Sequence, residues 1–161
     1  TQSRSSAASD VYKRQVLHRT FYLSVAHETD APVHLRSIVP RAREFNARCG
    51  ISGLLVYDGV HFAQILEGSL AALLPLLSRI AADRRHTRFT SLFTEPIASR
   101  GFEGWALGYT HRPQARQDIV RVLDSPLTNY GEAVKLARHL ADGIQIRTLH
   151  GRGGVAGEQQ P

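Results

Sequence analysis

The dipeptide Asp58-Gly59 lies between two mostly apolar runs, and it constrains the fold more than any other feature of the sequence. Asp-Gly is favoured in the tight turns of β-hairpins, because these residues tolerate the backbone conformation that such turns require. We therefore predict a hairpin whose strands are Ile51–Tyr57 and Val60–Glu67.

Gln64 is a polar residue in the middle of the second predicted strand. Alternation along a strand places it on the same face as Phe62 and Leu66, with Ala63 and Ile65 on the other face. A buried carboxamide that lacks a partner destabilises a fold by roughly 1–3 kcal/mol. We therefore expect a second polar side chain on that face to form a hydrogen bond with Gln64.

The spacing of apolar residues predicts further elements on both sides of the hairpin. The expected segments are a strand at Thr20–Val25, helices at Asp30–Cys49 and Leu70–Ala82, strands at Phe89–Glu95 and Leu107–His111, and weaker helices at Gln114–Leu123 and Tyr130–Ala141. The strand and helix order is that of an α+β fold, the ferredoxin-like βαββαββ sheet with one added strand. Two helices would cover one face of the sheet, and the two C-terminal helices would cap the other.

Both long helices carry an apolar stripe and an internal proline. The first stripe also includes the polar Asn46, and it comprises Leu35, Ile38, Val39, Ala42, Phe45 and Cys49. The second stripe comprises Leu70, Leu73, Leu74, Leu77 and Ile80. Pro40 and Pro75 lie inside these helices, where a proline costs about 3 kcal/mol or bends the helix. Asp30 is the expected N-cap of the first helix, and Gly50 the residue that ends it.

Length and composition limit the class of protein. The chain has 161 residues, which suits one domain, and no apolar run reaches the length of a membrane span. Its single cysteine, Cys49, excludes an internal disulfide and fits a reducing cytoplasm, and no metal-ligand spacing surrounds it. The chain contains no methionine. We set aside residues 1–15 as an adaptor-like segment and expect residues 146–161 to be a disordered, glycine-rich tail.

The net charge gives a weak argument for nucleic-acid binding. The whole chain carries +6, and residues 1–15 supply +2 of this through Arg4, Lys13 and Arg14 against Asp10, which leaves +4. Nucleic acid is therefore an unlikely partner. An RNA-binding ferredoxin-like module would also need exposed aromatic residues on its central strands, but Phe21 and Phe62 are expected on opposite faces.

Four polar residues are unusual when they are considered together. Tyr22 and Ser24 share one face of the first strand, Asn46 lies in the inward stripe of the first helix, and Gln64 lies in mid-strand. Three of them have an ordinary explanation on their own: a core tyrosine with a tethered hydroxyl, a glutamine on a solvated face, or an asparagine turned to water. Because all four converge on one helix-covered side of the sheet, they indicate a polar slot for a flat ligand.

Four ordered motifs carry a resemblance to a known family. They are YLS (Tyr22–Ser24), FNARCGISGLLVYDGVHFAQILEG (Phe45–Gly68), RIAADRRH (Arg79–His86) and FEGWALGY (Phe102–Tyr109). Over about Leu17 to Pro113 the sequence resembles a BLUF domain, the flavin-binding blue-light sensor module. The resemblance implies a ferredoxin-like sheet with flavin between two helices, and it assigns residues 16–113 to this domain and 114–145 to the cap helices.

The resemblance implies a role for each matching residue. Tyr22 would reduce the excited flavin, Gln64 would lie between Tyr22 and the flavin ring, and Asn46 would bond the ring's pyrimidine edge, with Ser24 close by. The remaining cofactor contacts, at the far edge of the ring or on the ribityl and phosphate side, would come from Arg79, Asp83, Arg85 and His86.

Three further positions depart from the family or vary within it. Trp105 matches a tryptophan that points inward in some relatives and outward in others, and we assign it to the photoactive site. Leu107 stands where many relatives have methionine, and its strand is expected to adjoin the strand that bears Gln64. Phe45 replaces a residue that is often polar, and it would stack on the ring or shield it.

The implied function is that of a blue-light photoreceptor and not of an enzyme. Light would drive electron and proton transfer from Tyr22 to noncovalently bound FAD (FMN or riboflavin being the alternatives), and Gln64 would then change its hydrogen bonds. We expect no output region after Pro113 and therefore expect signalling through contacts, in a homo-oligomer and with a downstream protein that the sequence does not identify. The alternatives are a ferredoxin-like module that binds RNA or an anionic ligand, and a scaffold of BLUF origin without photoactivity. A LOV-type sensor would need its cysteine directly after the asparagine, whereas Cys49 lies three residues after Asn46.

Overall fold

A five-stranded sheet organises the computed structural model, which describes residues 15–27, 31–125 and 130–149. The elements in chain order are β1 (Leu17–Ala26), α2 (Ala31–Arg48), β2 (Ser52–Tyr57), β3 (His61–Ser69), α3 (Leu70–Ala81), β4 (His86–Ile97), β5 (Gly108–His111), the 3-10 turn η1 (Pro113–Ala115), α4 (Arg116–Leu123) and α5 (Tyr130–Leu149). The strand order is β4-β1-β3-β2-β5. This confirms the predicted ferredoxin-like sheet with one added strand.

The Asp58-Gly59 turn joins β2 and β3 as predicted. Gly59 has a φ of 100°, in the region that favours glycine, and the Asp58 carboxylate accepts hydrogen bonds from the backbone N–H groups of Val60 (2.8 Å) and His61 (2.6 Å). The added strand β5 pairs in parallel with β2. The expectation that it adjoins the Gln64 strand is therefore wrong, because both edges of β3 are already occupied by β1 and β2.

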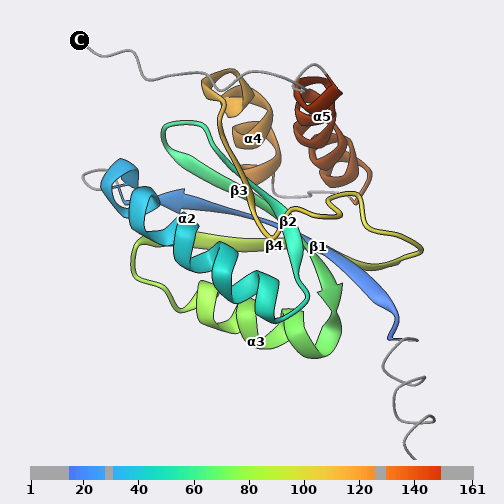
Figure 1. Cartoon of the computed structure of the whole chain (residues 1–161). Coiled ribbons are helices and arrows are strands. Elements are labelled where there is room, and N and C mark those ends of the chain that lie inside the picture. Colours follow the sequence, from blue (N-terminus) through green and yellow to red (C-terminus); the bar gives the residue numbers. More distant parts are fainter. Residues whose placement is uncertain (1–14, 28–30, 126–129, 150–161) are drawn as a thin grey trace, which may run out of the picture.

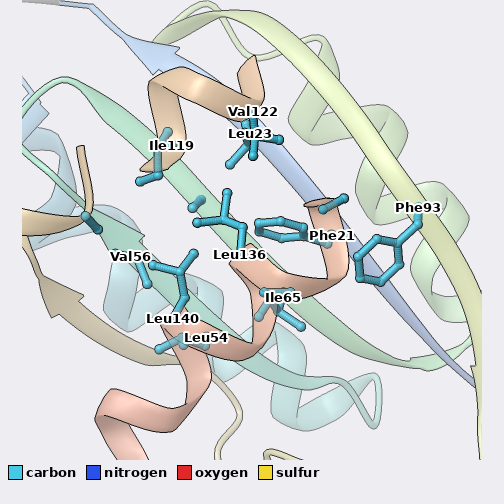
Figure 2. Close-up of a cluster of buried hydrophobic side chains, with 14 of the residues drawn as sticks. Phe21, Leu23, Leu54, Val56, Ile65, Phe93, Ile119, Val122, Leu136 and Leu140 are labelled. Atoms are coloured by element: carbon cyan, nitrogen blue, oxygen red, sulfur yellow. The ribbon is translucent and has the colours of Figure 1, made fainter. Parts of the chain in front are cut away.

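Helices cover both faces of the sheet (Figure 1). On one face α4 and α5 pack over the larger core cluster, which Figure 2 shows in close-up. Its sheet side chains include Phe21, Leu23, Leu54, Val56 and Ile65, and its helical side chains include Ile119, Val122, Leu136 and Leu140. The predicted cap helices are thus confirmed. α2 and α3 lie on the opposite face, the face that carries Tyr22 and Phe62.

Some details of the helices differ from the prediction. Cys49 is exposed, because α2 ends at Arg48 and Gly50 (φ 64°) turns the chain away. Leu70 and Leu74 also face outward, because α3 packs through Leu73 and through the partly buried Leu76, Leu77 and Ile80. Both helices continue through their prolines, whose rings lie on the exposed side.

The C-terminal boundary is also different. α5 extends to Leu149, eight residues beyond the predicted end at Ala141, so the prediction of disorder is wrong for residues 146–149. The proposed Asp30 cap, residues 1–14 of the adaptor-like segment and residues 150–161 of the tail lie outside the described residues.

Candidate functional site

A cleft of about 490 Å³ lies between α2 and α3 on the side of the sheet opposite α4 and α5. It brings together ten of the eleven predicted site residues, namely Tyr22, Ser24, Phe45, Asn46, Gln64, Arg79, Asp83, Arg85, His86 and Leu107. They come from two strands, two helices, the turn between α3 and β4, the start of β4 and the segment before β5. The topology of the fold therefore gathers residues that are as much as 85 positions apart in the sequence.

Tyr22 and Gln64 form the central polar pair of the cleft. They are direct partners in the antiparallel register of β1 and β3, and the Tyr22 hydroxyl donates a hydrogen bond to Gln64 Oε1. Both side chains are buried, with 4% and 7% exposure. The partner that a buried Gln64 requires is thus the tyrosine hydroxyl. Burial, with a further contribution from the negative charge of Asp83, raises the pKa of Tyr22 well above its ordinary value.

Two buried polar atoms at this cleft have no protein partner. Among the described residues, the buried side-chain polar atoms that form no hydrogen bond are Ser24 Oγ and His86 Nδ1. The other ring nitrogen of His86 lies 2.7 Å from the carbonyl oxygen of Ile80. An unpartnered polar group is unfavourable inside a protein. The two atoms therefore indicate that the cleft accommodates a ligand with hydrogen-bonding groups.

Asn46 connects the cleft to the segment before β5. It is 2% exposed on the inner side of α2, and its Nδ2 donates to the carbonyl oxygen of Ala106 at 2.8 Å. Arg43, one turn earlier on the same helix, donates from Nε to the carbonyl oxygen of Leu107 at 2.7 Å. Arg43 is a residue that the sequence analysis missed, because its role depends on a backbone carbonyl 64 residues away.

Charged groups line the α3 end of the cleft. The Asp83 carboxylate pairs with the Arg85 guanidinium, and this hydrogen-bonded contact lowers the pKa of Asp83 to about 2. The guanidinium of Arg79 lies 5.0 Å above the centre of the Phe45 ring, in a cation–π contact that connects α3 with α2. Phe45 therefore already stacks with a protein group at the rim.

Leu107 and Trp105 lie on different sides of the sheet. Leu107 is 3% exposed and lines the cleft, whereas Trp105 packs against the core cluster beneath α4 and α5. Trp105 therefore does not line the cleft in this structure, contrary to the expectation that it belongs to the photoactive site. The reason is local: a Cβ at Gly108 would lie 2.5 Å from the Trp105 ring, so the absent side chain leaves the space that the indole occupies.

Other kinds of site receive no support from the described residues. Among them, no three His, Cys, Asp or Glu side chains gather in a way that could hold a metal ion. No helix in the described ranges is both long and apolar enough to cross a membrane. A second cavity, of about 400 Å³, lies on the α5 side and is lined by Arg19, Phe93 and Tyr130 among others, but neither unpartnered polar atom belongs to it.

Comparison with known proteins relates this chain to one family. The family model described as sensors of blue light using FAD matches residues 17–108. The photoactivated adenylate cyclase subunit alpha of Euglena gracilis is 32% identical over 97 residues, which is 59% of this chain but 10% of that protein. The chain thus spans about a tenth of the length of this curated relative.

Solved structures of similar sequence have the same fold. The dark-state structure of BlrB, a BLUF protein, is 30% identical with a TM-score of 0.67 and covers 80% of this chain and 98% of that one. Klebsiella pneumoniae BlrP1, solved with FMN and cyclic diGMP, is 32% identical with a TM-score of 0.60. That match covers 79% of this chain and 35% of the BlrP1 chain. From the family match over residues 17–108 and from these structures, the chain belongs to the BLUF family of blue-light sensors.

Proposed function

We propose that this chain binds an oxidised flavin noncovalently in the α2–α3 cleft and converts blue light into a changed hydrogen bond at Gln64. The observation that carries the proposal is the buried Tyr22–Gln64 hydrogen bond on the floor of that cleft. It joins a redox-active phenol to a carboxamide that can both donate and accept. This pair supplies the donor and the switch that a flavin photosensor needs.

The residues of the cleft fit a flavin. Its volume of about 490 Å³ is within the range of small-molecule pockets. The unpartnered Ser24 Oγ and His86 Nδ1 offer hydrogen bonds, and Asn46 offers a carboxamide. Arg79 supplies positive charge at the α3 end, where Arg85 is already paired with Asp83, and this charge suits the phosphates of FAD. We propose FAD as the native cofactor, and FMN and riboflavin are the alternatives to be separated by analysis of the bound flavin.

Tyr22 would act as the electron and proton donor. The flavin supplies absorption of blue light and, once excited, the capacity to accept an electron. The raised pKa keeps Tyr22 a neutral phenol in the dark. A phenol that loses an electron becomes a strong acid, so its proton would move along the existing hydrogen bond to Gln64 Oε1. In the dark the electron and the proton would return to Tyr22.

Gln64 would act as the switch. In the structure its Oε1 accepts from Tyr22, which leaves its Nε2 to donate to another group in the cleft. Proton arrival would allow this side chain to reorient or to change tautomer, and the altered hydrogen bond to the ligand would shift its absorption to the red. Leu107 cannot accept a bond from the amide, so the change would reach neighbouring strands by packing.

The output of this sensor is proposed to be a protein contact. α4 and α5 are the described elements that pack on the other side of the sheet from the cleft, and they would present the changed surface to a second copy or to a downstream protein. The exposed, unpaired Cys49 supports a reducing compartment such as the cytoplasm. We assign no catalytic activity to the chain.

The test begins with purified protein kept in the dark. Denaturation should release free flavin, which chromatography identifies as FAD, FMN or riboflavin. Blue light should then produce a reversible red shift in the intact protein, and Gln64→Leu should keep the flavin but lose the shift. A colourless protein that takes up no added flavin would remove the proposal, and a flavin-loaded protein without any shift would leave a scaffold that has lost its photochemistry.

A further inference from the structure

A second buried polar cluster is centred on Glu67, at the end of β3 that lies away from the Asp58-Gly59 turn. The Glu67 side chain is completely buried, although it is a carboxylate. It lies three residues after Gln64, so strand alternation directs it to the other face of the sheet. A buried carboxylate is strongly unfavourable unless its oxygens are well bonded, so its partners identify what it holds in place.

Each Glu67 oxygen has several donors. Oε1 accepts from Arg19 Nε (2.9 Å) and Nη2 (2.7 Å) and from the backbone N–H of Gly101 (3.0 Å). Oε2 accepts from the backbone N–H of Phe102 (3.1 Å) and from the Ser52 hydroxyl (3.4 Å). Two of these donors belong to the segment between β4 and β5. The carboxylate therefore fixes backbone that is 34 and 35 residues away in the sequence.

Residues 98–107 connect β4 to β5, and this segment contains Trp105 and Leu107. At its start, Arg100 donates to Ser52 Oγ (2.8 Å) and to the backbone oxygens of Glu67 (2.9 Å) and Gly50 (2.6 Å). At its end, Asn46 and Arg43 hold the carbonyls of Ala106 and Leu107, as described above. The 98–107 segment is thus fixed at both ends by groups from outside it.

We infer that Glu67 is a positioning residue that fixes the 98–107 segment, so that Leu107 lines the α2–α3 cleft and Trp105 packs against the core cluster on the other side of the sheet. The side on which Trp105 lies is then set by a buried carboxylate that is outside the cleft. This inference goes beyond the proposed photochemistry, since the position of Trp105 can be measured in protein that contains no flavin.

Glutamine cannot replace Glu67 in this role. The two carboxylate oxygens accept from Gly101 and Phe102 separately, whereas a glutamine offers one oxygen and one NH2 group. Its NH2 group would face one of the two backbone donors, and the pairing with Arg19 would lose its charge. The 98–107 segment can be bound to residue 67 or released from it. Loss of one charge-assisted hydrogen bond should shift this equilibrium about tenfold or more toward the released state.

The test uses Trp105 as a reporter, because it is the one tryptophan in the sequence. Glu67→Gln should shift the Trp105 emission to longer wavelength and increase its quenching by acrylamide in full-length, flavin-free protein. In flavin-loaded protein the dark-recovery rate should also change. The matched control is Asp58→Asn, because Asp58 is an equally buried carboxylate that bonds only within its own turn. It should lower stability and leave the Trp105 emission unchanged.

A second variant keeps the inference testable if Glu67→Gln does not fold. Arg100→Met removes the three hydrogen bonds from Arg100 to Gly50, Ser52 and Glu67, and the Arg100 side chain is only partly buried. It should move the Trp105 emission in the same direction. A folded Glu67→Gln protein with wild-type Trp105 emission and quenching would overturn the inference. So would an equal shift in Asp58→Asn, because the effect would then be general loosening of the fold.

Discussion

The Tyr22–Gln64 pair makes a quantitative prediction about stability that does not need light. Tyr22→Phe leaves Gln64 Oε1 without its donor, and Gln64→Leu leaves the Tyr22 hydroxyl without its acceptor. A buried polar group that loses its partner destabilises a protein by about 1–3 kcal/mol. Tyr22→Phe keeps the aromatic contact with Phe89, whose ring centre lies 4.7 Å away, so packing changes little. Each single variant should therefore unfold more easily by about this amount.

The double variant should be at least as stable as either single one. It removes both polar groups together and leaves neither of them unpaired, and such paired replacement is nearly neutral. The two losses therefore should not add, and the coupling free energy between the two sites should be at least about 1–3 kcal/mol. A coupling free energy of this size follows from the Tyr22–Gln64 hydrogen bond, because both side chains are less than a tenth exposed.

Urea unfolding of flavin-free protein, followed by far-ultraviolet circular dichroism, measures the four free energies of unfolding in this cycle. The flavin is left out because it binds only the folded state and would add its own stabilisation. Losses that add within about 0.5 kcal/mol would refute the pairing of Tyr22 with Gln64. In flavin-loaded protein, all three variants should lack the normal dark-recovering red shift.

Three further predictions concern the rim and the output. Leu107→Met should keep the photocycle and change its dark-recovery rate, with less than about 1.5 kcal/mol of stability lost, because the volume is nearly conserved; flash spectroscopy and urea unfolding measure both. The depressed pKa of Asp83, about 2 against an ordinary 3.8, stabilises the folded state above pH 3.8, and this contribution is lost as the pH falls from about 4 to 2. Acid unfolding should therefore be less steep in Asp83→Asn over that range, and an identical slope would contradict the Asp83–Arg85 pairing. Hydrogen exchange in darkness and under blue light should differ in residues 107–111 and in α4 or α5, whereas a change confined to the surroundings of Tyr22 and Gln64 would mean that the described part of the chain does not transmit the signal.

Local patterns in the sequence determined most of the fold. The Asp-Gly turn, the alternation in β1 and β3 and the stripes of α2 and α3 depend on neighbours within a few residues, so they can be read without a structure. The same alternation placed Tyr22, Ser24 and Gln64 on one face, and the family resemblance added Asn46 and the charged residues of the α3 end. In the structure, ten of the eleven predicted site residues line one cleft.

Only the tertiary structure decided how the segment before β5 lies. The sequence could not show that β5 pairs with β2, because the edge to which a strand adds depends on which edges are already occupied. It could not show that Trp105 turns away from the cleft while Leu107 enters it, since that depends on the space left by Gly108. The anchoring of this segment by Glu67, Arg43 and Asn46 was equally hidden, because each bond reaches a backbone group more than 30 residues away and carries no sequence pattern.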